Sequence, residues 1–142
     1  MQSIRHSLRE WPGRTVPAIV YAGIVFAASV VNPPSGGQPA VGPLGLVGAD
    51  KWVHAIAYAV LTVLLAYALW ATTFRLLVVV AVVASVYGLG IELVQSALPF
   101  RTFDRLDAAA NTLGVLVAGL VLWVVSWCLD ESSGRWVARE SR

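Results

Sequence analysis

The chain has 142 residues, of which 58% are hydrophobic and only 13% are charged. A water-soluble domain of this size needs more polar surface than these residues provide, so the composition excludes that class and predicts an integral membrane protein. The formal net charge of +2 comes mostly from the terminal segments. Because no basic stripe is interleaved with aromatic residues, we expect no nucleic-acid partner.

Four apolar runs follow one another along the chain, at residues 15–31, 52–71, 76–98 and 108–129. The last three reach the roughly 20 residues that an α-helix needs to cross a bilayer core, and the first is near the short limit. We therefore expect an all-α fold, an integral membrane bundle of about four transmembrane helices. The simplest organisation is a single domain over residues 1–142 with short tails at both ends.

The first run has an alternative interpretation. Three arginines precede it, and it passes through Ala27-Ala28-Ser29, an arrangement also typical of a cleaved signal peptide. Because the run continues to Val31, we favour a retained span and leave cleavage open.

The segments between the runs differ in character. Residues 32–49 carry four of the seven prolines and five glycines, which predicts an irregular surface loop. Residues 72–75 form a link so short that the second and third spans must make an antiparallel hairpin.

Lysine and arginine are unevenly distributed over these segments. Seven of the ten lie in the N-terminal tail, the 72–75 link and the C-terminal tail, and three lie in the other two loops. The positive-inside rule therefore predicts a multi-pass protein of the plasma membrane with both termini in the cytoplasm. The opposite ends of the spans then face outward.

Polar residues collect at these outward-facing ends, beginning with the second span. Asp50, His54 and Tyr58 recur every four residues on one helix face, with Lys51 beside them. A structural explanation is available for two of them, because Asp50 could cap the helix N-terminus and Lys51 could extend to the lipid headgroups.

The third span carries a deeper acid. Glu92 lies six residues before Leu98, hence about 9 Å below the outer end of the helix. A carboxyl at that depth must be protonated, paired or hydrogen-bonded. Gln95 shares its face, and Gly88, one turn deeper, would let a neighbouring helix approach closely.

The corner before the fourth span completes the set, with Arg101 at its rim. Polar and small residues then recur at spacings of three and four: Asp104, Asp107, Asn111, Gly114 and Ala118. Gly114 and Ala118 suit close helix packing, so we expect the polar residues above them to face the bundle. Either Thr102 or Asp104 can cap the fourth helix.

In this order, the residues resemble the VanZ-like family. The resemblance rests on Asp50-Lys51-x-x-His54-x-x-x-Tyr58, Glu92-x-x-Gln95, Arg101, Asp104, Asp107 and Asn111-x-x-Gly114, within residues 50–118. It implies a small multi-span membrane protein of the kind whose namesake gives low-level resistance to teicoplanin. No settled catalytic mechanism comes with the resemblance, which therefore narrows the fold more than the function.

The favoured function is an outward-facing polar pocket that binds or modulates an envelope lipid or glycolipid precursor. Lys51, His54 and Arg101 would hold phosphate or sugar oxygens of an anionic or glycosylated headgroup. Gln95, Asp107 and Asn111 would exchange hydrogen bonds with hydroxyl groups. The expected partners are membrane lipids, and a homo-oligomer is left open.

Two alternatives remain. The catalytic residues of an enzyme acting on such a headgroup are unknown, with His54 and Glu92 as candidates for acid and base. A cation held by Glu92, Asp104 and Asp107 would be Mg²⁺ or Mn²⁺ rather than zinc, but we assign neither a metal site nor a cofactor. In the other alternative, the polar network only stabilises the bundle. Whether the protein is an enzyme stays open.

Overall fold

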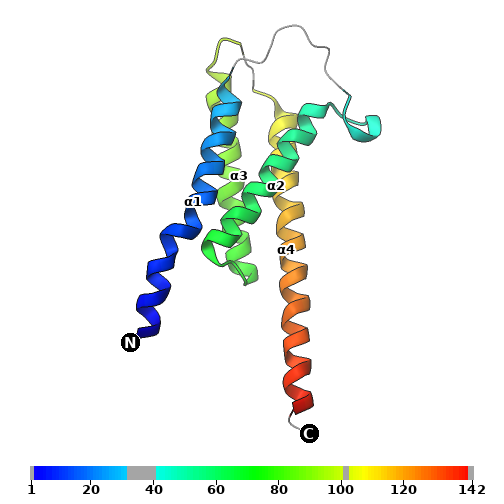
Figure 1. The fold of residues 1–142 in the computed structure, drawn as a ribbon. Coiled ribbons are helices and arrows are strands. Elements are labelled where there is room, and N and C mark those ends of the chain that lie inside the picture. Colours follow the sequence, from blue (N-terminus) through cyan, green and yellow to red (C-terminus); the bar gives the residue numbers. More distant parts are fainter. Residues whose placement is uncertain (1, 32–40, 101–102, 141–142) are drawn as a thin grey trace.

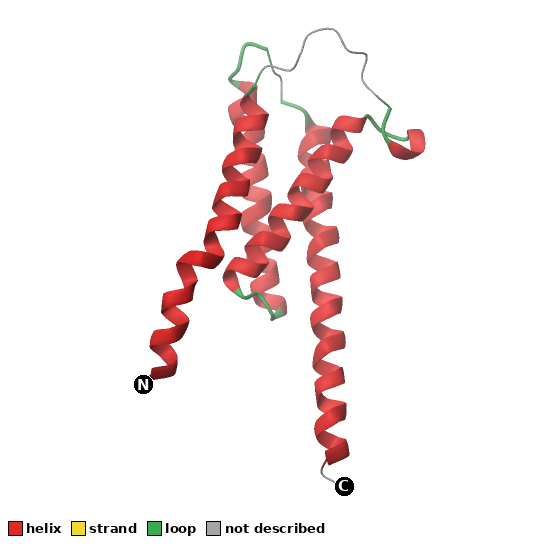
Figure 2. Cartoon of the chain, in the orientation of Figure 1, coloured by secondary structure: helices red, strands yellow, loops and turns green. Residues whose placement is uncertain are grey.

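The computed structural model describes the backbone of residues 2–31, 41–100 and 103–140, and the side chains of those between residues 13 and 129 apart from Leu44. The described chain forms four α-helices, drawn in Figures 1 and 2: α1 (Gln2–Val30), α2 (Ala49–Leu69), α3 (Phe74–Ser96) and α4 (Arg105–Glu140). Both termini lie at the same end of the bundle (Figure 1). At the opposite end α1 and α3 finish and α2 and α4 begin.

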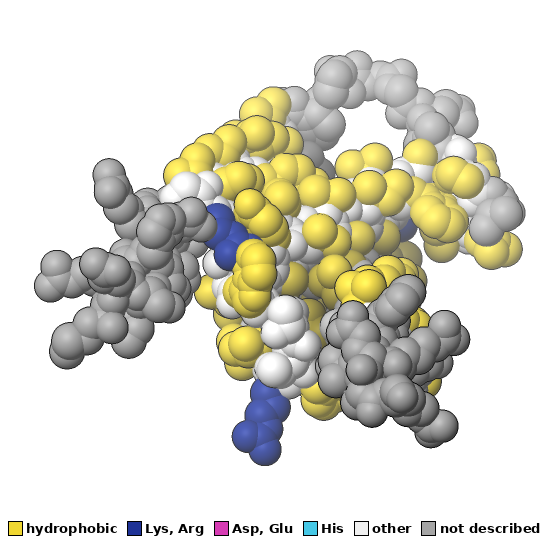
Figure 3. Space-filling model, turned by 60° about the horizontal axis from the view of Figure 1, so that its bottom comes forward, with side chains coloured by type: hydrophobic (Ala, Val, Ile, Leu, Met, Phe, Trp, Pro, Cys, Tyr) yellow, Lys and Arg dark blue, Asp and Glu magenta, His cyan; other side chains and the backbone are white. Residues whose placement is uncertain are grey.

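Each helix contains a segment long and apolar enough to cross a membrane. These segments are Gly13–Val30, Ala49–Leu69, Phe74–Ser96 and Arg105–Leu129. Hydrophobic side chains cover much of the described surface visible in Figure 3, as expected where helices face lipid. The expectation of an all-α membrane bundle with four spanning helices is confirmed.

The helix ends differ slightly from the sequence prediction. Helix α2 begins at Ala49, with Gly48 as its N-cap, so the interpretation of Asp50 as the cap is wrong. At its other end Trp70 takes a left-handed conformation with φ of 51° and ends the helix. Thr73 then caps α3, accepting a hydrogen bond from Leu76 N at 3.4 Å. The link of the α2–α3 hairpin is therefore residues 70–73.

The residues before α2 are only partly described. Residues 32–40 of the expected irregular loop lie outside the described chain. The remainder contains a short 3-10 helix, η1 (Pro43–Gly45), and a single bridge that pairs Val41 with Gly48. This part leads directly into the first turn of α2.

Small residues set the approach of the helices at the centre of the bundle. Gly114 of α4 lies against the backbone of α2 so closely that a Cβ atom there would overlap the Ala55 carbonyl oxygen. Gly88 of α3 lies against the Tyr58 ring, which a Cβ would approach to 2.9 Å. Ala118 is buried on α4. Tyr58 is itself buried in the core between Leu61, Ala84 and Val115.

Aromatic residues mark the end of the bundle where the termini lie. The Arg14 guanidinium is 3.7 Å from the ring centroid of Trp70 and 4.6 Å from that of Tyr67. Phe74 and Trp123 meet edge to face with their centroids 6.2 Å apart. This arrangement is typical of a membrane interface, where amphipathic rings and arginine side chains settle together.

Gly114→Val tests the close crossing of α2 and α4. We expect it to lower the free energy of unfolding by about 3 kcal/mol, because the obstructing atoms belong to the backbone and must move as a unit. The thermal midpoint of the detergent-solubilised protein measures the effect. Gly119→Val is the matched control, since nothing lies within 4 Å of a Cβ at that position of the same helix. Equal midpoints for the two variants would contradict the proposed contact.

Candidate functional site

Lys51 joins α2 to the start of α4 through an ion cluster. Its Nζ lies 2.6 Å from Asp104 Oδ2, 2.6 Å from Asp107 Oδ1 and 2.8 Å from Asp50 Oδ2. Only 14% of the Lys51 side chain is exposed. The ammonium group is therefore turned into the bundle, and does not extend to the lipid headgroups.

Asp104 has two roles at the beginning of α4. Its Oδ1 accepts a hydrogen bond from Leu106 N at 2.7 Å and caps the helix, as the sequence suggests. Its Oδ2 accepts one from Lys51. The hydrogen bond from Lys51 in particular, with that from Leu106 N, holds the pKa of Asp104 below its usual value. Asp104 is therefore ionised at neutral pH.

His54 continues the polar contacts one turn deeper on α2. Its Nδ1 is 3.0 Å from Asn111 Oδ1, and its Nε2 is 3.5 Å from Asp107 Oδ2. An amide oxygen only accepts hydrogen bonds, so Nδ1 carries the proton in this arrangement. Asn111 thus orients the imidazole, and Nε2 faces the Asp107 carboxylate.

Glu92 is the least satisfied polar residue of the site. It is fully buried on α3, at 0% exposure, and neither carboxylate oxygen has a hydrogen-bond partner among the described residues. Asn111 Nδ2 and the Tyr58 hydroxyl, both buried, also have none. Burying an unpaired polar group costs roughly 1–3 kcal/mol, and more for a charge. The site therefore carries donors and acceptors that none of the described side chains satisfies.

Glu92 lies close to two other residues whose side chains can bind a metal ion. Ligand atoms of His54, Glu92 and Asp107 all lie within 4.8 Å of one another, and the three residues come from α2, α3 and α4. Asp104, which the sequence analysis grouped with Glu92 and Asp107 as ligands for a cation, belongs instead to the contacts of Lys51. Below, "polar cluster" denotes Asp50, Lys51, His54, Glu92, Asp104, Asp107 and Asn111.

Helix α1 contributes to the site in a way that the sequence analysis missed. Gln95 of α3 donates a hydrogen bond to the Ser29 carbonyl at 2.9 Å, and Tyr87 donates one to the Ala22 carbonyl at 2.6 Å. Both acceptors are backbone atoms of α1, which every residue possesses. No side-chain pattern in the first run could therefore have revealed these contacts.

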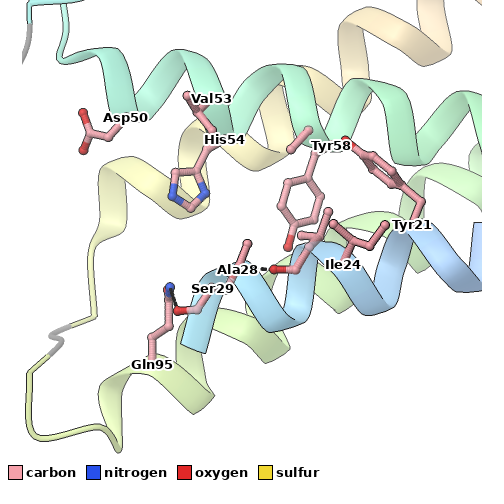
Figure 4. A pocket seen from close by; sticks show the side chains of 11 residues that line it. Tyr21, Ile24, Ala28, Ser29, Asp50, Val53, His54, Tyr58 and Gln95 are labelled. Atoms are coloured by element: carbon pink, nitrogen blue, oxygen red, sulfur yellow. Dashed lines mark hydrogen bonds between the residues drawn. The ribbon is translucent and has the colours of Figure 1, made fainter. Parts of the chain in front are cut away.

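A cavity of about 450 Å³ opens between α1 and the α2–α3 hairpin (Figure 4). Four residues singled out from the sequence line it: Asp50, His54, Tyr58 and Gln95. The remaining wall is mainly apolar and comes from α1 and α2, with Ser29 beside Gln95. His54 belongs both to this wall and to the polar cluster, whereas Glu92 does not line the cavity. Arg101 lies outside the described residues.

Replacing Lys51 tests the ion cluster. Because the folded-state pKa of Asp104 is depressed, its stabilising contribution is present above its unfolded pKa and is lost as the pH falls through the folded value. Lys51→Gln removes the counter-ion and leaves three carboxylates close together. We expect a loss of about 3 kcal/mol at pH 7, partly recovered near pH 4 as protonation relieves the repulsion. Thermal midpoints measured across this range should therefore rise on acidification in the variant and fall in the original protein; parallel curves would contradict this.

One comparison with known proteins gives a match. The family model for VanZ/LLP1 matches residues 6–126, which include the polar cluster, the first span and most of the fourth. No curated protein and no solved structure matches the chain. The family match extends well beyond residues 50–118 and covers most of the sequence, so the chain belongs to the VanZ/LLP1 family.

Proposed function

We propose that this membrane protein binds the hydroxyl-rich headgroup of a glycosylated envelope lipid in the cavity between α1 and the α2–α3 hairpin. The amphipathic character of that cavity carries the proposal. Asp50, His54 and Gln95 lie toward one end of it, and Tyr21 and Ile24 lie toward the other (Figure 4). A lipid has the same division, with a polar headgroup joined to an apolar chain.

The charges of the polar cluster favour a sugar over a directly bound phosphate. The cluster holds four carboxyl groups, and Lys51 already contacts three of them. Its ammonium group is therefore not free to hold an anion in the way that the sequence suggested. Carboxylate, imidazole and amide groups at the cavity wall instead offer acceptors and donors for hydroxyl groups.

The attachment of α1 is consistent with entry of a lipid from the side. Its spanning segment is the least buried of the four, with 6% of its residues buried compared with 17–33% in the others. Its contacts with α3 include hydrogen bonds to two carbonyls. Where the cavity separates α1 from the polar half of α2, there is room for an acyl chain.

The proposed orientation follows from the positive-inside rule, which puts both termini in the cytoplasm. The polar end of the cavity then opens at the outer leaflet of the plasma membrane. Glycosylated envelope lipids present their headgroups there.

The geometry favours binding over catalysis. Of the two candidate catalytic residues, His54 lines the cavity and Glu92 lies behind it. A general acid or base must come within hydrogen-bonding distance of the reacting group, directly or through one water. A headgroup held in the cavity would contact His54 directly, whereas Glu92 is not part of the cavity wall.

The binding test uses three short-chain lipids with the same acyl chains: a glucosyl diacylglycerol, a phosphatidylcholine and a phosphatidic acid. The thermal midpoint of the purified protein is measured with each, in detergent containing a chelator. We expect the glucosyl lipid to raise the midpoint most, since a ligand at 100 times its Kd stabilises the folded state by about 2.7 kcal/mol. A larger shift with phosphatidic acid would overturn the preference for hydroxyl groups, and no shift with any lipid would overturn binding.

Two tryptophan substitutions locate the ligand. Ala28→Trp places a large ring in the cavity wall and should abolish the shift given by the glucosyl lipid. Ala27→Trp is the matched control, because Ala27 is also exposed on α1 but does not line the cavity. His54→Ala should weaken binding through loss of the polar contact. If Ala28→Trp binds the lipid as well as Ala27→Trp does, the ligand lies elsewhere.

A further inference from the structure

We propose that His54, Glu92 and Asp107 form a binding site for a divalent cation at the meeting point of α2, α3 and α4. The site goes beyond the proposed lipid binding and does not depend on it. One ligand comes from each of three helices, with the contributing atoms within 4.8 Å of one another. Metal–ligand bonds of about 2.1 Å place ligand atoms roughly 3–4.2 Å apart, so a small inward movement of the side chains completes the site.

The contact between His54 and Asp107 fits a shared cation better than a hydrogen bond. His54 Nε2 and Asp107 Oδ2 are 3.5 Å apart, beyond the usual 2.7–3.2 Å of an N–H···O hydrogen bond. That separation lies within the range for two atoms bound to one metal ion.

The state of Glu92 is the second, independent observation. Its carboxyl group is fully buried, and both oxygens lack hydrogen-bond partners among the described residues. A carboxylate buried in its ionised form needs hydrogen bonds, an ion-pair partner or a metal ion. A cation would satisfy it directly, since one of its oxygens already faces His54 and Asp107.

Asn111 prepares the imidazole for this role. Its Oδ1 lies 3.0 Å from His54 Nδ1 and accepts a hydrogen bond from the N–H there. In the neutral imidazole, the lone pair of Nε2 is then directed toward the acids. Metal-binding histidines commonly donate the other ring N–H to such a partner, which fixes both tautomer and orientation.

The excess of acidic groups over basic groups in the polar cluster also supports a cation site. Lys51 contacts Asp50 and Asp104 as well as Asp107, so a single positive charge is shared among three carboxylates. Glu92 adds a fourth acid. A divalent ion beside Glu92 and Asp107 would neutralise two negative charges in a region of low dielectric constant, where uncompensated charge is costly.

The ligand set indicates a class of metal ion. Two carboxylate oxygens with one imidazole nitrogen, and no thiolate, suit an ion that accepts both oxygen and nitrogen ligands. We assign the site to Mn²⁺ in preference to Ca²⁺, which takes six to eight oxygen ligands. Water or a hydroxyl group of a bound ligand would complete the coordination.

The test is direct binding of Mn²⁺ to the full-length protein in detergent, after chelator treatment and without added lipid. Loss of the electron paramagnetic resonance signal of free Mn²⁺ gives the affinity and stoichiometry. We expect one ion per chain, with Glu92→Gln and Asp107→Asn each weakening binding at least tenfold. Asn111→Ala should weaken it by a similar factor, through loss of histidine orientation. Competition with Zn²⁺, Mg²⁺ and Ca²⁺ checks the assigned class, and displacement of Mn²⁺ by Ca²⁺ at equal concentration would overturn that assignment.

Asp50→Asn is the matched control, because it removes a carboxylate of the polar cluster outside the proposed ligand set. It should bind Mn²⁺ as the original protein does. His54→Gln provides a further ligand variant if either acidic variant fails to purify as a single folded species. Absence of Mn²⁺ binding, or unchanged binding in the folded ligand variants, would overturn the site. Neither result would affect the lipid test, which is performed in chelator.

Discussion

The arrangement of the polar end depends on the contact of Lys51 with Asp104 and Asp107. A membrane-embedded charge needs a partner, because water is not there to stabilise it. Here the charge on α2 is neutralised by carboxylates at the start of α4. Close contact between Gly114 and the Ala55 backbone brings the two helices near enough for this. Close packing and ion pairing therefore act on the same helix crossing.

Some residues of the polar cluster have hydrogen-bond or ion-pair partners among the described residues, and others do not. Lys51 and Asp104 have partners in the protein, and His54 is oriented by Asn111. Glu92 has no hydrogen-bond partner within the described part of the chain, although it is fully buried among the same helices. A purely structural network would be expected to satisfy its most deeply buried acid. This difference favours a site that is completed by a group outside the described side chains.

The cavity and the proposed cation site meet at His54. The cavity is an amphipathic space bounded by α1 and suits a lipid with hydroxyl groups. The proposed cation site consists of three ligand atoms that lie deeper, between α2, α3 and α4. Because the imidazole belongs to both, a bound cation would alter the hydrogen-bonding capacity of the cavity wall. Lipid binding and cation binding can be measured separately, so this connection is open to experiment.

The sequence alone determined the four spans and the gathering of polar residues at one end, because hydropathy and helical spacing are local properties. It also indicated Asp104 as one of two candidate caps, and the small residues at Gly88 and Gly114. Only the tertiary structure decided that Lys51 turns inward, that Asp50 is not a cap, and that Ser29 accepts a hydrogen bond from Gln95. Spacing places a residue on a face of its own helix, but the rotation of neighbouring helices decides which faces meet. That rotation depends on packing between segments far apart in the chain, and a local sequence pattern does not predict such packing.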